Sequence, residues 1–241
     1  MDAVTSAVLL GFILGLQHAT DPDHLVAVAT IATREERLLG GLRVGLLWGV
    51  GHTVTLAIAG TVVVAIGRNV PVRVATGLEL LVAALLVVLG VSRLLDAARG
   101  ILAVAPERRV GDHTHGRGAS GVLHTHHGAP HVHPSPALLA AWRDEARSTG
   151  LRALVVGAVH GLAGTAAVAL LVLATLPSPG AAAVYLAIFG LGTIVGMTAL
   201  TGVMAYPIVR LARVRIMRHA MAVASGVAAI AFGFWYAARL V

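Results

Sequence analysis

The stretch His18-Ala-Thr-Asp-Pro-Asp-His24 places two imidazoles, two carboxylates and a proline within seven residues. Its flanks, 3–16 and 25–32, are almost wholly apolar, and neither alone reaches the ~20 helical residues that cross a bilayer. Together with the motif they are long enough, so we expect the polar cluster within the depth of a membrane. Ionisable groups at that depth are costly and mark ion or substrate paths.

The composition is that of a polytopic helical membrane protein. Of the 241 residues, 57% are hydrophobic and 12% are charged, and the mean hydropathy is +0.86. The 18 basic residues are all Arg and flank apolar runs, which indicates membrane topology and lipid headgroup contact rather than nucleic-acid binding. The chain has no cysteine, so a metal site must use nitrogen and oxygen donors.

Hydropathy predicts an all-α polytopic membrane fold with six transmembrane helices. The first is interpreted as a retained span, because no basic segment or small-residue cleavage site accompanies it. Three Arg residues fall on one side of the spans and 15 on the other. By the positive-inside rule, both termini are expected outside a bacterial inner membrane, with the central loop in the cytoplasm. The expected spans are 3–32, 41–67, 74–98, 151–176, 180–207 and 218–239.

The chain is expected to divide into residues 1–100, 101–147 and 148–241. The outer two segments each hold three spans and share three short matches in the same order. Because an odd number of spans reverses the second half, they are predicted to be two inverted three-helix repeats, typical of secondary transporters with a midplane site. The matches pair Gly15-Leu-Gln-His18 with Gly157-Ala-Val-His160, Trp48-Gly-Val-Gly51 with Phe189-Gly-Leu-Gly192, and Gly90 with Gly233.

The middle segment, 101–147, is rich in histidine. It is predicted to be a mostly disordered cytoplasmic loop with a short helix around 136–147. Closely spaced histidines favour sequestration or sensing of divalent cations, and the alternative is a polar linker without a defined site. These residues are His113, His115, His124, His126, His127, His131 and His133.

The opening motif is expected to break its helix. On an uninterrupted helix, His18, Asp21 and His24 share a face of about 120° and Asp23 points away. Pro22 lacks the N–H that would bond the His18 carbonyl, so the helix should kink or unwind and let Asp23 turn inward. Broken helices at membrane depth line a cavity or an ion site. The alternative is that two Asp–His pairs cap a kink at the membrane surface.

The donor set of this motif suits a divalent metal. Imidazole and carboxylate without sulfur favour Ni²⁺, Co²⁺, Zn²⁺ or Mn²⁺, and two carboxylates offset the charge of the ion. Two further histidines lie within predicted spans, where each either lines the ion path or hydrogen-bonds across helices. Glu79, and Asp96 beside Arg93, are expected near the membrane interface. The predicted metal ligands are His18, Asp21, Asp23, His24, His52 and His160.

The motif resembles the H-A-x-D-A-D-H signature of the nickel/cobalt transporter family, and Gly51-His-Thr53 also resembles the family pattern. The D-P-D-H form and His160-Gly-Leu-Ala-Gly-Thr165 are closer to urease accessory membrane proteins and nickel/cobalt efflux proteins. The resemblance implies that His18, Asp21, Asp23 and His24 handle the metal. The chain departs from the importers where they carry the acidic motif L-G-x-D-T-A-T-E, and Thr201 lies near the place of another expected acid.

These observations predict transport of Ni²⁺ or Co²⁺ as substrate, through the broken first helix, by movement of the two repeats against each other. Export is slightly favoured, because a cytoplasmic histidine-rich loop resembles the efflux branch. The sequence has no ATP-binding P-loop, so transport is expected to use an ion gradient, with protons as one candidate, or a separate partner.

No resident cofactor and no enzymatic activity are expected. The main alternative is a non-transporting membrane accessory that delivers nickel to maturation proteins of an enzyme such as urease. Two others are an intramembrane metalloenzyme, although the chain lacks an H-E-x-x-H motif, and an exporter of small organic solutes.

Overall fold

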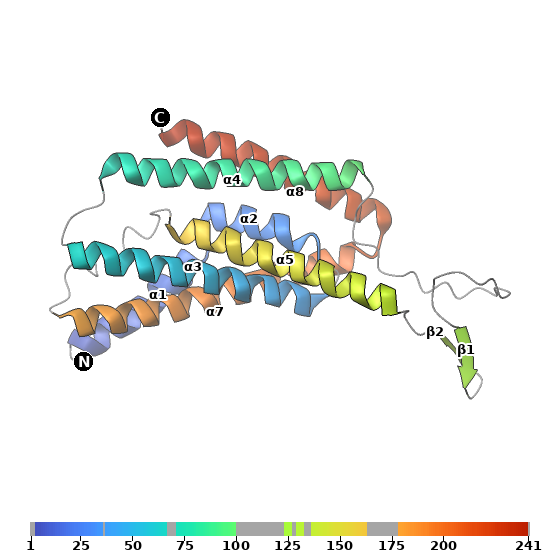
Figure 1. Ribbon diagram of the computed structural model, residues 1–241, viewed down its shortest axis with the longest axis horizontal. Helices are drawn as coiled ribbons and strands as arrows, with labels where there is room; N and C mark the ends of the chain where they lie inside the picture. The colour runs from blue at the N-terminus through green and yellow to red at the C-terminus, as the bar shows by residue number, and fades with distance from the viewer. Residues whose placement is uncertain are drawn as a thin grey trace.

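The computed structural model describes residues 3–35, 37–66, 71–99, 123–126, 129–132, 136–162 and 178–240. This part of the chain is helical apart from one short antiparallel hairpin, formed by β1 (Leu123–His126) and β2 (Ala129–Val132). The helices are α1 (Ala3–His18), α2 (Pro22–Ala32), α3 (Leu38–Ile66), α4 (Val72–Ala98), α5 (Pro136–Leu162), α7 (Pro179–Leu211) and α8 (Arg215–Leu240) (Figure 1).

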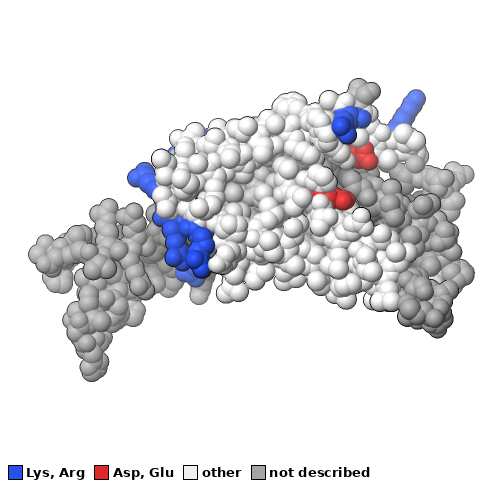
Figure 2. Space-filling view, turned by 180° about the vertical axis from the view of Figure 1, so that it is seen from behind, with Lys and Arg blue, Asp and Glu red and all other residues white. Residues whose placement is uncertain are grey.

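Four described helices are long and apolar enough to cross a membrane: Leu38–Val62, Val72–Ala98, Gly180–Leu211 and Arg215–Leu240. They coincide with four of the predicted spans. Figure 2 shows the described Arg atoms of one face toward the two ends of the molecule, with a broad uncharged surface between them and a few acidic atoms toward one end. The protein is therefore a helical membrane protein.

The other two predicted spans are only partly matched. The first consists of two shorter helices, α1 and α2, and the fourth begins in α5, while residues 163–177 lie outside the described part of the chain. The six-span count stays a prediction.

The first span breaks at the motif, which confirms the expectation from Pro22. Helix α1 ends at His18 and α2 begins at Pro22, with Asp21 as its N-cap residue in a non-helical conformation. The His18 carbonyl, which Pro22 cannot bond, accepts the Asp21 N–H at 3.2 Å and faces Nδ1 of His24 at 3.0 Å. The break thus frees a backbone acceptor that a side chain of the motif then satisfies.

Apart from α2, the described helices form two groups. Helix α3 packs against both α5 and α7, and α1 packs along α7; we call α1, α3, α5 and α7 the four-helix bundle. Helices α4 and α8 pack mainly against each other and form the α4–α8 pair. Figure 1 shows this pair along one side of the molecule and α2 between it and the bundle.

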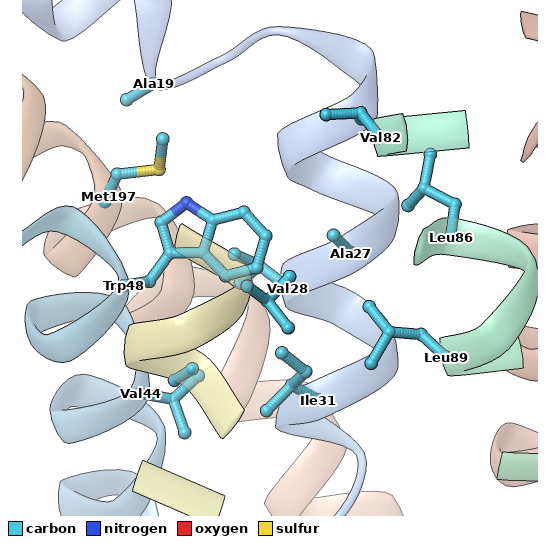
Figure 3. Close-up of a cluster of buried hydrophobic side chains, with 12 residues drawn as sticks. Ala19, Ala27, Val28, Ile31, Val44, Trp48, Val82, Leu86, Leu89 and Met197 are labelled. Carbon is cyan, nitrogen blue, oxygen red and sulfur yellow. The ribbon is translucent and has the colours of Figure 1, made fainter. Parts of the chain in front are cut away.

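Helix α2 is the apolar link between these two groups. Its side chains Val28 and Ile31 are buried in one cluster with Trp48 of α3 and Leu86 of α4. In Figure 3 the α3 and α7 side chains of this cluster lie on one side of α2 and the α4 side chains on the other. An eleven-residue helix with apolar contacts on both sides is held as part of the core rather than at the surface.

Part of the predicted histidine-rich loop is described. His124 in β1 lies opposite His131 in β2 in the hairpin register. The helix expected around 136–147 is present as the start of α5, which continues without interruption to Leu162. The remainder of the loop, including His113, His115, His127 and His133, lies outside the described residues, so the predicted disorder and the metal role of these histidines are untested.

Candidate metal centre

The break between α1 and α2 orients His24. Because Nδ1 of His24 faces the His18 carbonyl at 3.0 Å, Nδ1 carries the proton and donates it. The other ring nitrogen, Nε2, then carries a lone pair. This side chain is completely buried, and within the described part of the chain its Nε2 has no hydrogen-bond partner. A buried lone pair held in place by a backbone carbonyl is the usual arrangement of a metal-binding histidine.

His160 repeats this arrangement on α5. Its Nδ1 lies 2.9 Å from the Val156 carbonyl one turn earlier, and its Nε2 is buried without a hydrogen-bond partner among the described residues. The Asp23 carboxylate lies between the two lone pairs, 3.7 Å from His24 Nε2 and 3.9 Å from His160 Nε2. These separations are too long for hydrogen bonds, and they leave the three ligand atoms free to approach one cation.

His18 is oriented by a carboxylate instead of a carbonyl. Its Nδ1 lies 2.9 Å from Asp21 Oδ2, and its Nε2 lies 2.9 Å from Nε2 of His52 on α3. If His18 donates through Nδ1, its Nε2 accepts the proton that His52 Nε2 donates. A cation bound between these two nitrogens would replace that proton. Asp21 is the most exposed member of the cluster, with 31% of its side chain accessible, and its carboxylate faces His18 and forms no side-chain cap on α2.

The four imidazoles form one contiguous group. The ring centroids of His18, His24 and His52 lie 4.8–5.0 Å apart, and His160 is 5.6 Å from His24. Two sets of ligand atoms each fall within 4.8 Å of one another, one in His18, His24 and His52 and the other in Asp21, Asp23 and His24. His24 belongs to both sets, so nitrogen-rich and oxygen-rich coordination share one residue.

Aromatic side chains close the group on two sides. Trp48 of α3 is completely buried, with its ring 4.8 Å from that of His160, and Phe189 of α7 lies 5.6 Å from His18. A low-dielectric wall strengthens the attraction between a cation and the nearby carboxylates. In the sequence both residues served only to align the two halves, and their contact with the histidines was not predicted. Their position directly before a Gly-x-Gly in each matched segment was the available signal.

The structure brings all six predicted ligands into one cluster. His18 ends α1, Asp21 and Asp23 flank Pro22, His24 lies in the first turn of α2, and His52 and His160 come from α3 and α5. Sequence spacing alone grouped His18, Asp21 and His24 on one helical face, whereas the break also turns Asp23 inward, where it is 5% exposed. That these side chains bind a metal stays a prediction.

Comparison with known proteins gives one clear relative. The urease accessory protein UreH of Bacillus sp. (strain TB-90) is 30% identical over 234 residues, which span 96% of this chain and 90% of that protein. No protein-family model matches the chain, and no solved structure matches it. An alignment of this length covers the motif, α3, α5 and the second half together. The chain belongs to the nickel/cobalt transporter superfamily, in its urease-accessory-like branch.

Proposed function

We propose that this protein carries Ni²⁺ or Co²⁺ across the bacterial inner membrane through the centre between α1 and α2. The observation that supports this most directly is the set of three histidines whose Nδ1 atoms each face an acceptor: Asp21, the His18 carbonyl and the Val156 carbonyl. Their Nε2 atoms are thereby prepared as ligands in a buried cluster that also contains Asp23. A centre of nitrogen and carboxylate donors without sulfur suits these two ions.

We also propose that the chain is built from two inverted three-helix repeats, 1–100 and 148–241. The support is a set of reciprocal close approaches, where a Cβ added to a glycine would collide with a neighbouring helix. Each contact has a counterpart in which both partners are replaced by the matching residues of the other half. The pairs are Gly15–Phe189 with Gly157–Trp48, Gly51–Leu154 with Gly192–Phe12, and Gly90–Gly226 with Gly233–Ala83.

The direction of matched helices supports the inversion. Along α3, Gly41, Gly45 and Gly49 lie against Ala205, Thr201 and Ile194 of α7, so the residue numbers run in opposite order and the two helices are antiparallel. Small residues at these positions let the backbones approach closely, as in packed membrane helices. The proposed two-fold relation places His18 beside Phe189 and His160 beside Trp48 in equivalent positions, so each repeat contributes a histidine with an aromatic neighbour.

We favour export, with both termini outside and the histidine-rich loop in the cytoplasm, where it would gather ions. The test is ⁶³Ni accumulation in host cells that lack their own nickel transporters, comparing the intact protein, His24→Ala and a chain deleted for residues 112–133. Export predicts less ⁶³Ni than in vector controls and a return to the control level with His24→Ala. Accumulation above the control, abolished by His24→Ala, would instead establish import. The loop deletion shows whether the loop histidines supply the path.

The second candidate is a non-transporting membrane accessory that holds nickel for the maturation of a nickel enzyme. The name of the UreH relative, a urease accessory protein, favours it. An accessory of this kind binds Ni²⁺ at the same centre but leaves the distribution of ⁶³Ni across the membrane unchanged. If cells that lack this protein lose urease activity while their ⁶³Ni content stays unaltered, the result would support this candidate over transport.

A further inference from the structure

Arg93 is a buried arginine near the C-terminal end of α4. It is 2% exposed and among the largest fully buried side chains. A buried guanidinium is costly unless its donors are satisfied. Its presence in α4, a helix that can span the membrane, therefore calls for a function.

The guanidinium of Arg93 binds the end of α2. Its Nε donates to Thr33 Oγ1 at 3.0 Å and its Nη2 donates to the Thr33 carbonyl at 2.8 Å. Thr33 is the C-cap residue of α2, where the last carbonyls lack helical partners and the helix dipole is negative. A two-point bond from a rigid planar group fixes both the position and the rotation of this helix end.

Further polar contacts at the same end join α2 to both helices of the α4–α8 pair. Thr33 Oγ1 lies 3.4 Å from Ser225 Oγ of α8, and Thr30 Oγ1 donates to the Ser225 carbonyl at 3.4 Å. Arg34, next along the chain, donates to Ser92 of α4 at 3.3 Å and forms an ion pair with Asp96. The C-terminal end of α2 is thus tied to α4 and α8.

The opposite end of α2 carries two residues of the metal centre, Asp23 and His24. The other histidines of the centre, His18, His52 and His160, lie on helices of the four-helix bundle. The centre is therefore divided between the bundle and a helix anchored on the α4–α8 pair. This division does not follow the repeats, because each of the two groups contains helices from both halves of the chain.

We propose that Arg93 is a positioning residue of the metal centre: by holding the C-terminus of α2 on the α4–α8 pair, it sets where Asp23 and His24 stand relative to the bundle histidines. It acts through the helix, because Thr33 lies nine positions after His24, about 14 Å along the axis. Movement of the pair against the bundle then assembles or opens the ligand set. This inference rests on the proposed metal-binding function.

The test measures Ni²⁺ binding by the purified full-length protein in detergent. The part of this binding that is lost in His24→Ala is taken as binding at the centre. We expect Arg93→Met to weaken this binding by about tenfold, the lower end for groups that orient metal ligands. Arg93→Lys should give an intermediate loss, because an ammonium keeps the positive charge but lacks the planar set of N–H donors that binds Thr33 at two points. Arg99→Met, a change at the exposed C-cap residue of the same helix, should leave the binding unchanged.

A merely structural role for Arg93 would lower the unfolding temperature and the folded yield but leave the Ni²⁺ affinity of the folded protein at the wild-type value, and that result would overturn the proposal. If Arg93→Met does not fold, Thr33→Val takes its place, since it removes one acceptor of Arg93 and is expected to weaken binding in the same direction. Unchanged affinity in Thr33→Val contradicts the proposal. Absence of His24-dependent binding in the wild-type protein would instead contradict the proposed function itself.

Discussion

Replacement of His24 by alanine is expected to abolish Ni²⁺ binding at the centre. The imidazole is the one ligand common to the nitrogen-rich and oxygen-rich sets, and its Nε2 is buried beside Asp23. Loss of groups that only orient a ligand typically costs ~10- to 100-fold in metal affinity, so loss of this ligand should cost about 100-fold or more. The measurement is calorimetric titration of the protein deleted for residues 112–133, which removes the seven loop histidines.

His219→Ala is the matched control for this experiment. His219 is exposed on α8 and makes no part of the cluster, so its removal should leave the affinity unchanged. His24→Ala also removes the bond from Nδ1 to the His18 carbonyl, worth about 1 kcal/mol, so a small fall in the unfolding temperature accompanies the loss of binding. Wild-type affinity in the folded variant would mean that the ion binds elsewhere.

The second large effect is expected for Gly157→Ala, at a close approach of α5 to α3. An added Cβ would overlap the Trp48 carbonyl oxygen and lie 2.9 Å from its carbonyl carbon, and neither backbone atom can rotate away. Overpacking of this kind typically costs ~1–3 kcal/mol of stability. Since Trp48 packs 4.8 Å from His160, displacement of α3 also disturbs the centre, and Ni²⁺ affinity should fall together with the unfolding temperature.

Gly77→Ala tests whether the effect depends on the contact rather than on glycine itself. A Cβ at Gly77 in α4 has no neighbour within 4 Å, so this change should leave the unfolding temperature equal to or slightly above that of the wild type, because alanine favours helix by about 1 kcal/mol. Equal unfolding temperatures for the two alanine variants would contradict the close packing of α3 and α5 described above.

The local chemistry of the centre was predictable from sequence because it follows from Pro22 and from the residues around it. The missing N–H predicts the break, and the break explains the inward position of Asp23. The recruitment of His52 and His160 was predictable only as a possibility, since membrane histidines also serve as plain hydrogen-bond partners. The two histidines come together because α3 packs against α5. That close packing requires Gly51 against Leu154 and Gly157 against Trp48.

Two features were beyond the sequence for a physical reason. The burial of Arg93 depends on where the end of α2 lies after the break, which the residues next to Arg93 in the chain do not specify. Likewise, three spans per half suggest that each half packs as a unit. Close approaches between glycines and carbonyls instead pack α1 on α7 and α5 on α3, so the halves interlock.

This packing favours movement between the two groups of helices over movement between the two repeats. If the two repeats moved as separate bodies, the glycine contacts between α1 and α7 and between α3 and α5 would have to separate. Movement of the α4–α8 pair against the four-helix bundle preserves these contacts and changes the distance from Asp23 and His24 to the other histidines. The position and orientation of α2 then determine whether Asp23 and His24 reach the other histidines.

Passage of metal through the centre is tested by ⁶³Ni flux into proteoliposomes that contain purified protein in known amount, with a proton gradient imposed in either direction. Passage of a metal ion through the centre predicts ⁶³Ni movement that saturates with concentration, collapses when the gradient is dissipated, and is absent for His24→Ala but retained for His219→Ala. Binding of ⁶³Ni to the protein without any flux, under either gradient and for Co²⁺ as well, would contradict transport by this chain.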